Sequence, residues 1–226
     1  MSLNGPQRWC KMKEVLKALP YHAKDVQALY VQPHWKGPEF SAPDEFLREL
    51  CEILPCLDEL TLNSITLGYP TDNSVSAPFR FESVRTLKII NCPIGSITRF
   101  HAIVEAFPSL VSFVLEESSW DDPLDYTPSR CPTLTKAMPN LRVIDIRYDF
   151  YWISSFHDWL SRAPHLCIVR FTQEMYQPLS FSGFTESIAL SKSIECIGHS
   201  LVYLGLSSYL FQAGPTCKSF HLQQRK

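Results

Sequence analysis

The chain has 226 residues, of which 45% are apolar, and its formal net charge is −2. This length suffices for one sizeable core, and the composition excludes a disordered chain. The charge is too near zero for general attraction to nucleic acid or to an anionic membrane. The first residues lack the apolar run of a signal peptide, and no stretch approaches the roughly 18 apolar residues of a membrane span. We therefore expect an intracellular protein, cytoplasmic or nuclear, with no nucleic-acid or membrane partner.

The eight cysteines are irregularly spaced and include no CxxC pair. Several lie within apolar periodic segments, where a thiol behaves as a small hydrophobic group. Cys196 and His199 have ligand-like spacing, but no second pair stands nearby to complete four zinc ligands. We therefore expect reduced structural thiols, with no disulfide framework, no metal and no cofactor.

Helical and extended patterns alternate along the chain. The predicted helices cover residues 7–20, 41–54, 96–106, 154–163 and 186–197, with a short one that reaches Met138. In the first of these, Pro20 is expected to end the helix before an extended segment begins. Its predicted apolar stripe comprises Trp9, Met12, Val15, Leu16 and Leu19.

Each helical segment is followed by an apolar frame of the form L-x-x-L-x-L, which is typical of leucine-rich repeats. The clearest copy is Val84-x-x-Leu87-x-Ile89-x-x-Cys92. The frames begin at Val26, Leu57, Val84, Leu110, Leu141, Leu166 and Leu201, at intervals of 31, 27, 26, 31, 25 and 35 residues. Four frames have a proline two residues before their start, at Pro55, Pro108, Pro139 and Pro164. Because proline cannot continue a helix, it fixes the turn from helix to strand.

Alternating helices and strands, with crossovers of about 20 residues, require parallel strands. A doubly wound sheet and a repeat solenoid share this element order. Only the frame positions are reliably apolar, which indicates half-buried strands. This favours an α/β leucine-rich-repeat solenoid of about seven β-α repeats, with one curved parallel sheet and helices on its convex side. We expect the solenoid to span residues 1–210 and a poorly ordered tail to span residues 211–226.

Four segments, VRTLKIINCPI, FPSLVSFVL, MPNLRVIDI and APHLCIVRF, resemble the leucine-rich regions of F-box-like proteins from mushroom-forming fungi. In such families an N-terminal F-box binds a Skp-type adaptor of a cullin ubiquitin ligase, and the repeats hold the substrate. The resemblance implies a substrate-recognition module and, through an F-box, an adaptor and a cullin as partners. The Leu-Pro-x-Glu opening of an F-box is absent here, so no F-box residue is carried over.

Strand alternation places the first, fourth and sixth frame positions in the core. The third, fifth and seventh positions form what we call the open face of the sheet. Its candidate protein-binding residues are Tyr30, Glu59, Lys88, Glu116, Asp145, Arg147, Arg170 and Tyr203. Strands in register would juxtapose Glu116 with Arg147, and Asp145 with Arg170. This mixed charge favours a protein or peptide partner. Alternatively, the pairs only neutralise each other and keep the sheet soluble.

Three further clusters of the sequence have simple interpretations. Residues 148–152 include four aromatic side chains, which suit either a partner or the space between neighbouring repeats. His157 and Asp158 are adjacent on a predicted helix and do not face each other, so they do not form a catalytic pair. The three aspartates between residues 121 and 125 lack EF-hand spacing and are interpreted as a solvated acidic loop.

These patterns predict a non-enzymatic protein-binding scaffold, and the resemblance implies the substrate-recognition part of an F-box-type ubiquitin ligase receptor. Two alternatives stay open. One is a truncated or degenerate repeat fragment without independent function. The other is a small α/β enzyme, which would need a pocket at the carboxyl ends of its strands.

Overall fold

The computed structural model describes residues 2–4, 6–32, 43–68, 79–118, 138–147, 163, 165–172, 200–207 and 219–220. Two compact units divide the chain. Unit 1 comprises Met1–Leu110 and Glu117–Pro132, and unit 2 comprises Val111–Glu116 and Thr133–Lys226. Several predicted features lie outside the described residues: both C-terminal helices, the aromatic cluster at 148–152, the aspartates at 121–125, the pair of residues 196 and 199, and the tail apart from residues 219–220.

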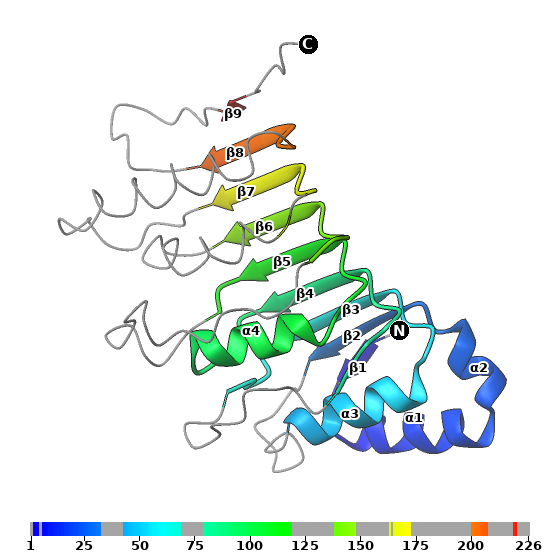
Figure 1. Cartoon of the computed structure of the whole chain (residues 1–226). Helices are drawn as coiled ribbons and strands as arrows, with labels where there is room; N and C mark the ends of the chain where they lie inside the picture. The colour runs from blue at the N-terminus through cyan, green and yellow to red at the C-terminus, as the bar shows by residue number, and fades with distance from the viewer. Residues whose placement is uncertain are drawn as a thin grey trace. The chain divides into compact units, whose positions relative to one another are not determined.

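Unit 1 contains a parallel ladder of four strands in the order of the chain (Figure 1). These strands are β1 (Ser2–Asn4), β2 (Ala28–Gln32), β3 (Glu59–Asn63) and β4 (Thr86–Ile90). Leu29 pairs with Leu60, and Leu60 pairs with Leu87, so the fourth frame positions are aligned across the ladder. Strand β1 lies before the first frame and is not among the predicted strands.

The helices of unit 1 are α1 (Pro6–Ala18), α2 (Pro20–Asp25), α3 (Pro43–Ile53) and α4 (Ile97–Glu105). Helices α1, α3 and α4 lie on one face of the ladder (Figure 1). Helix α1 ends before Pro20, as expected, and the extended segment follows later. Between them Pro20 begins the short helix α2, which was not predicted; proline suits a first helical position, where the missing N–H would have no partner.

The apolar stripe of α1 is narrower than the sequence pattern predicted. Trp9, Met12 and Leu16 are buried, whereas Val15 is 54% exposed and Leu19 is 46% exposed. Val15 lies about 100° around the helix from Leu16, which turns it away from the core. Leu19 follows the last residue of α1 and so leaves the stripe.

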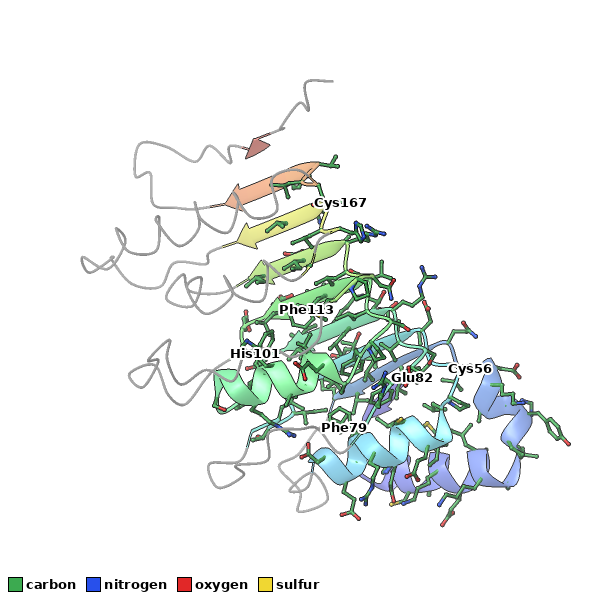
Figure 2. The ribbon with its side chains drawn as sticks, viewed as in Figure 1. Cys56, Phe79, Glu82, His101, Phe113 and Cys167 are labelled. Atoms are coloured by element: carbon green, nitrogen blue, oxygen red, sulfur yellow. The ribbon has the colours of Figure 1, made fainter. Side chains whose placement is uncertain are left out.

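The core of unit 1 lies between the ladder and the helices. Its frame residues are almost fully buried, as Leu60, Leu87 and Ile89 illustrate. Beside them, the ring of Phe81 stacks on Phe107 at a centroid distance of 5.0 Å, and Phe79, labelled in Figure 2, packs 6.0 Å from Phe81. The prediction that the first, fourth and sixth frame positions form the core is therefore confirmed for the frames that begin at Leu57 and Val84. In the first frame Leu29 and Val31 are buried, but Val26, at the end of α2, is only half-buried.

Unit 2 contains four parallel strands in the order of the chain: β5 (Ser112–Glu116), β6 (Val143–Arg147), β7 (Ile168–Thr172) and β8 (Tyr203–Ser207). A two-residue strand, β9 (Ser219–Phe220), pairs with β8 in the antiparallel direction. In both units, every frame carries a five-residue strand that starts at its third position. The chain is thus an α/β protein with parallel strands, as predicted.

Within each unit, a repeated backbone contact joins a frame to the next one. The carbonyl oxygen of Gln27, at the second frame position, accepts hydrogen bonds from the N–H groups of Asp58 at 2.8 Å and Glu59 at 2.9 Å. In four further pairs of frames, the carbonyl at the second position accepts the equivalent two bonds from the next frame. These carbonyls belong to Asp58, Val111, Arg142 and Cys167. Only backbone atoms take part, so these positions tolerate chemically unrelated side chains.

In six of the seven frames, the turn into the strand has one of two forms. Where proline precedes the frame, the N–H of the first frame residue bonds the carbonyl three residues earlier; Leu110 donates to Phe107 in this way at 3.1 Å. The frames that begin at Val84 and Leu201 lack this proline and instead have a serine just before their start. The hydroxyl of Ser83 donates to the carbonyl of Leu57 at 2.7 Å, and the hydroxyl of Ser200 donates to the carbonyl of Leu166 at 2.9 Å. Each acceptor is the first residue of the preceding frame.

Three strands end in the same backbone conformation. Ser64, Asn91 and Glu117 hold the eighth frame position at φ of 57°, 51° and 47°. This left-handed conformation turns the chain off the strand, and the next residue is buried each time. The last two of these buried residues touch, because the N–H of Cys92 donates to the hydroxyl of Ser118 at 3.3 Å.

The five described cysteines are free thiols. Cys92 is fully buried, and its thiol donates to the carbonyl of Ile90 at 3.2 Å. Burial raises the pKa of this thiol to about 11. Cys92 is therefore an inward-facing, unreactive thiol. Cys10 and Cys56, by contrast, are exposed.

Candidate binding face

The open face of unit 1 carries three of the predicted binding residues. Tyr30, Glu59 and Lys88 are all half-buried on strands β2, β3 and β4. The hydroxyl of Tyr30 donates to Gln32 at 3.0 Å and accepts from the side-chain amide of Asn63 at 2.5 Å. Tyr30 is thus held in a polar chain that crosses from β2 to β3.

Lys88 and Glu59 form an ion pair across β3 and β4, with 2.6 Å between Nζ and Oε1. The register pairs Glu59 with Thr86, so the two charges are diagonal neighbours. Their side chains are 37% and 39% exposed. At that exposure, an ion pair contributes only ~0–1 kcal/mol to stability. This part of the face is electrically neutral and contributes little to the free energy of folding.

The open face of unit 2 carries the other five predicted residues. The register of β5, β6 and β7 places Glu116 beside Arg147 and Asp145 beside Arg170, as predicted. The guanidinium of Arg147 lies 3.1 Å from Glu116 and 3.3 Å from Asp145. The guanidinium of Arg170 lies 4.0 Å from the same Asp145 oxygen, Oδ2. One carboxylate oxygen therefore faces both arginines.

Tyr203 completes this cluster on β8. Its ring lies 5.5 Å from the guanidinium carbon of Arg170, at cation–π distance. Arg170 is thus bounded by a carboxylate on one neighbouring strand and by an aromatic ring on the other. Four adjacent strands contribute to the cluster through Glu116, Asp145, Arg147, Arg170 and Tyr203.

Asp145 is buried although its frame position faces outward. Its side chain is 8% exposed, whereas those of Arg147 and Arg170 are 44% and 52% exposed. Oδ1 of Asp145 is buried and has no hydrogen-bond partner among the residues that the structure describes. The sequence pattern predicted a face of mixed charge. In the structure the aspartate side chain is buried, whereas the two arginine side chains are about half exposed.

Sequence reasoning missed two features of the open face. Thr61 occupies an outward position on β3 but is only 6% exposed. The ion pair between Lys88 and Glu59 was also missed, because only side chains directly opposite each other were considered. The length of the lysine side chain was the available signal, since it reaches diagonal neighbours on the next strand.

Within the described ranges, no helix is long and apolar enough to cross a membrane. The same residues include no group of three His, Cys, Asp or Glu side chains that could hold a metal ion.

No family model, curated protein or solved structure matches this chain. What the chain does must therefore be argued from its own residues, and the open face is where they offer most.

Proposed function

We propose that this chain is a non-enzymatic leucine-rich-repeat scaffold that binds a protein partner on its open face. The observation that carries the proposal is the common start of the strands: in all seven frames the strand begins at the third position. Within each unit, side chains of equivalent positions therefore form rows across neighbouring strands. Such rows make an elongated surface, which suits a polypeptide better than a small molecule.

Two recurrent backbone features support the repeat architecture. One is the shared carbonyl at the second frame position, and the other is the left-handed residue at the eighth. Both recur at fixed frame positions although the side chains differ. Within each unit, a stack of equivalent repeats in which each is bonded to the next accounts for them.

A test of the binding face compares affinity purifications that use the whole chain as bait. The wild type is set beside Lys88→Glu, a double Arg147→Glu/Arg170→Glu variant, and Arg85→Glu. Arg85 is an exposed residue at a second frame position and serves as the matched off-face control. We expect specific partners to remain with the control and to be lost from at least one face variant. An identical set of partners in all four purifications would refute the assignment of the face.

We further infer a role in substrate recognition by a ubiquitin ligase, and this rests on the four segments that resemble F-box-like proteins. If it is correct, the same purifications recover a Skp-type adaptor, directly or through another subunit. Face-dependent partners without an adaptor or cullin would remove the ligase role and leave the scaffold. A purified chain that unfolds without cooperativity would instead favour a degenerate repeat fragment.

A further inference from the structure

We propose that Arg147 and Arg170 form a carboxylate site that receives an acidic side chain from an extended segment of the partner protein. This inference rests on the proposed function, because it places the partner on the open face. It adds the chemistry of the partner and the position of its anchor. The site lies entirely within unit 2.

The two arginines converge on one atom. Arg147 lies on β6 and Arg170 on β7, and both guanidiniums approach Oδ2 of Asp145, at 3.3 and 4.0 Å. Two cations that face one oxygen lie side by side. Each guanidinium has five N–H donors in a planar fork, so the pair can offer several donors to a second carboxylate from the solvent side.

Each arginine is also held from another side. Glu116 binds Arg147 at 3.1 Å, and the ring of Tyr203 lies against Arg170. Side chains that are fixed before binding lose less conformational entropy when a ligand arrives. The side chains of Arg147 and Arg170 are 44% and 52% exposed, so both can be reached by such a ligand.

The burial of Asp145 points in the same direction. A buried carboxylate oxygen without a hydrogen-bond partner destabilises a fold. Oδ1 of Asp145 is in that position among the described residues. Fold stability therefore does not explain why an aspartate occupies this outward frame position. Its role in positioning Arg147 and Arg170 does explain it.

An apolar row lies next to the arginines. Val143, Ile168 and Tyr203 occupy the third frame positions, where they pair in register and are half-buried. Ile168 and Arg170 are two residues apart on β7, a separation of about 6.6 Å. In an extended peptide, side chains two residues apart have the same spacing. The site therefore fits a segment with an apolar residue and an acidic residue two positions apart.

The charge of the cluster favours a carboxylate over a phosphate. Arg147 and Arg170 are balanced by Glu116 and Asp145, so the cluster has no net positive charge. A doubly charged phosphate would meet repulsion from both acids, whereas a single carboxylate meets less. An acidic segment is accordingly the partner that these residues fit best.

Labelled synthetic peptides test the site in fluorescence anisotropy titrations of the whole chain. The first peptide repeats leucine and glutamate two positions apart, the second replaces glutamate with glutamine, and the third replaces it with phosphoserine. We expect the glutamate peptide to bind about tenfold more tightly than the glutamine peptide. We expect Arg147→Gln and Arg170→Gln each to weaken its binding about tenfold as well.

The matched control is Arg142→Gln, which removes an exposed arginine of the same unit at a second frame position. It should leave the affinity unchanged, and circular dichroism should show that all three variants remain folded. A variant that does not fold is replaced by Arg147→Lys or Arg170→Lys, which keep the charge and lose the planar fork, and which should still weaken binding.

Several results would overturn the carboxylate site. They are equal affinity for the glutamate and glutamine peptides, an equal loss with Arg142→Gln, preference for phosphoserine, or no binding by any peptide. In each of these cases, loss of natural partners from the Lys88→Glu variant would show that the open face still binds them elsewhere. If the affinity purifications recover the same partners with every face variant as with the wild type, the proposed function itself is refuted.

Discussion

The ion pair between Arg99 and Asp44 should be the most costly polar contact to break in unit 1. Nη2 of Arg99, on α4, donates to Asp44 in the first turn of α3, and Nε donates to the carbonyl of Leu67 at 2.9 Å. The two charged side chains are 9% and 22% exposed. Breaking a buried pair leaves an uncompensated charge and costs ~3–5 kcal/mol. We expect about 3 kcal/mol for Arg99→Met, because Asp44 keeps some water and lies at a helix N-terminus, which favours an acid.

Asp44→Asn should cost at least as much, since it leaves the more deeply buried guanidinium without its counter-charge. The double variant Arg99→Met/Asp44→Asn should recover most of the loss, because no buried charge remains unpaired. Urea denaturation followed by far-UV circular dichroism measures all three free energies of unfolding. Losses that simply add in the double variant would show that the two residues are not coupled.

The control for this cycle is Arg48→Met. Arg48 pairs with Glu45 at 3.6 Å on α3, and both side chains are at least half exposed. Such a pair contributes ~0–0.5 kcal/mol. If Arg99→Met and Arg48→Met lower stability equally, burial is not what makes the Arg99 pair important, and the reasoning fails.

Three further changes have outcomes that differ in sign or in pH dependence. The hydrogen bond from Lys13 lowers the pKa of Glu49 below its usual 4.5 and raises the pKa of Lys13 above its usual 10.5. Ionised Glu49 therefore stabilises the fold above pH 4.5, and this effect is lost as the pH falls through the pKa of Glu49 in the folded protein. Protonated Lys13 stabilises the fold below pH 10.5, and this effect is lost as the pH rises through the pKa of Lys13 in the folded protein. Glu49→Gln should therefore cost ~0.2–1 kcal/mol at pH 7 and almost nothing at pH 2 in urea titrations, and an equal loss at both would contradict the linkage. Asp145→Val should leave the free energy of unfolding unchanged or raise it by ~1 kcal/mol, because its arginine partners can turn to water; a loss above ~2 kcal/mol would show that the aspartate serves stability. Ser83→Ala should cost ~1 kcal/mol through its lost bond to the preceding frame, whereas Ser109→Ala, at the same position beside a proline turn, should cost close to nothing.

The positions of the strands follow from the spacing of the apolar residues. Frame residues such as Leu60 and Leu87 must be buried, and a parallel ladder aligns them, so the register could be worked out without coordinates. The pairing of Glu116 with Arg147 followed from the same periodicity. These predictions succeeded because they depend on a repeat that occurs many times along the chain.

Features that depend on three-dimensional neighbours could not be predicted in this way. Strand β1, with the sequence Ser-Leu-Asn, has no apolar frame and exists through its pairing with β2. The burial of Asp145 depends on how its neighbours, Arg147 on the same strand and Arg170 on the next, are placed around it. The serine turns do leave a signal in the sequence. Apart from the first frame, only those that begin at Val84 and Leu201 lack the turn proline, and both have a serine, Ser83 or Ser200, just before their start. That signal is recognisable only once the geometry of the turn is known.

The short strands at the margins of the two ladders have a consequence for how the protein behaves at high concentration. An edge strand presents unpaired N–H and C=O groups that can recruit an edge from another molecule. In unit 1, β2 is covered by the three-residue β1; in unit 2, β8 is covered by the two-residue, antiparallel β9. Neither covering strand is long enough to template much further pairing. We therefore expect that removal of Ser219 and Phe220 would leave the edge of β8 unpaired and increase self-association, while the side chains of the open face stay unchanged.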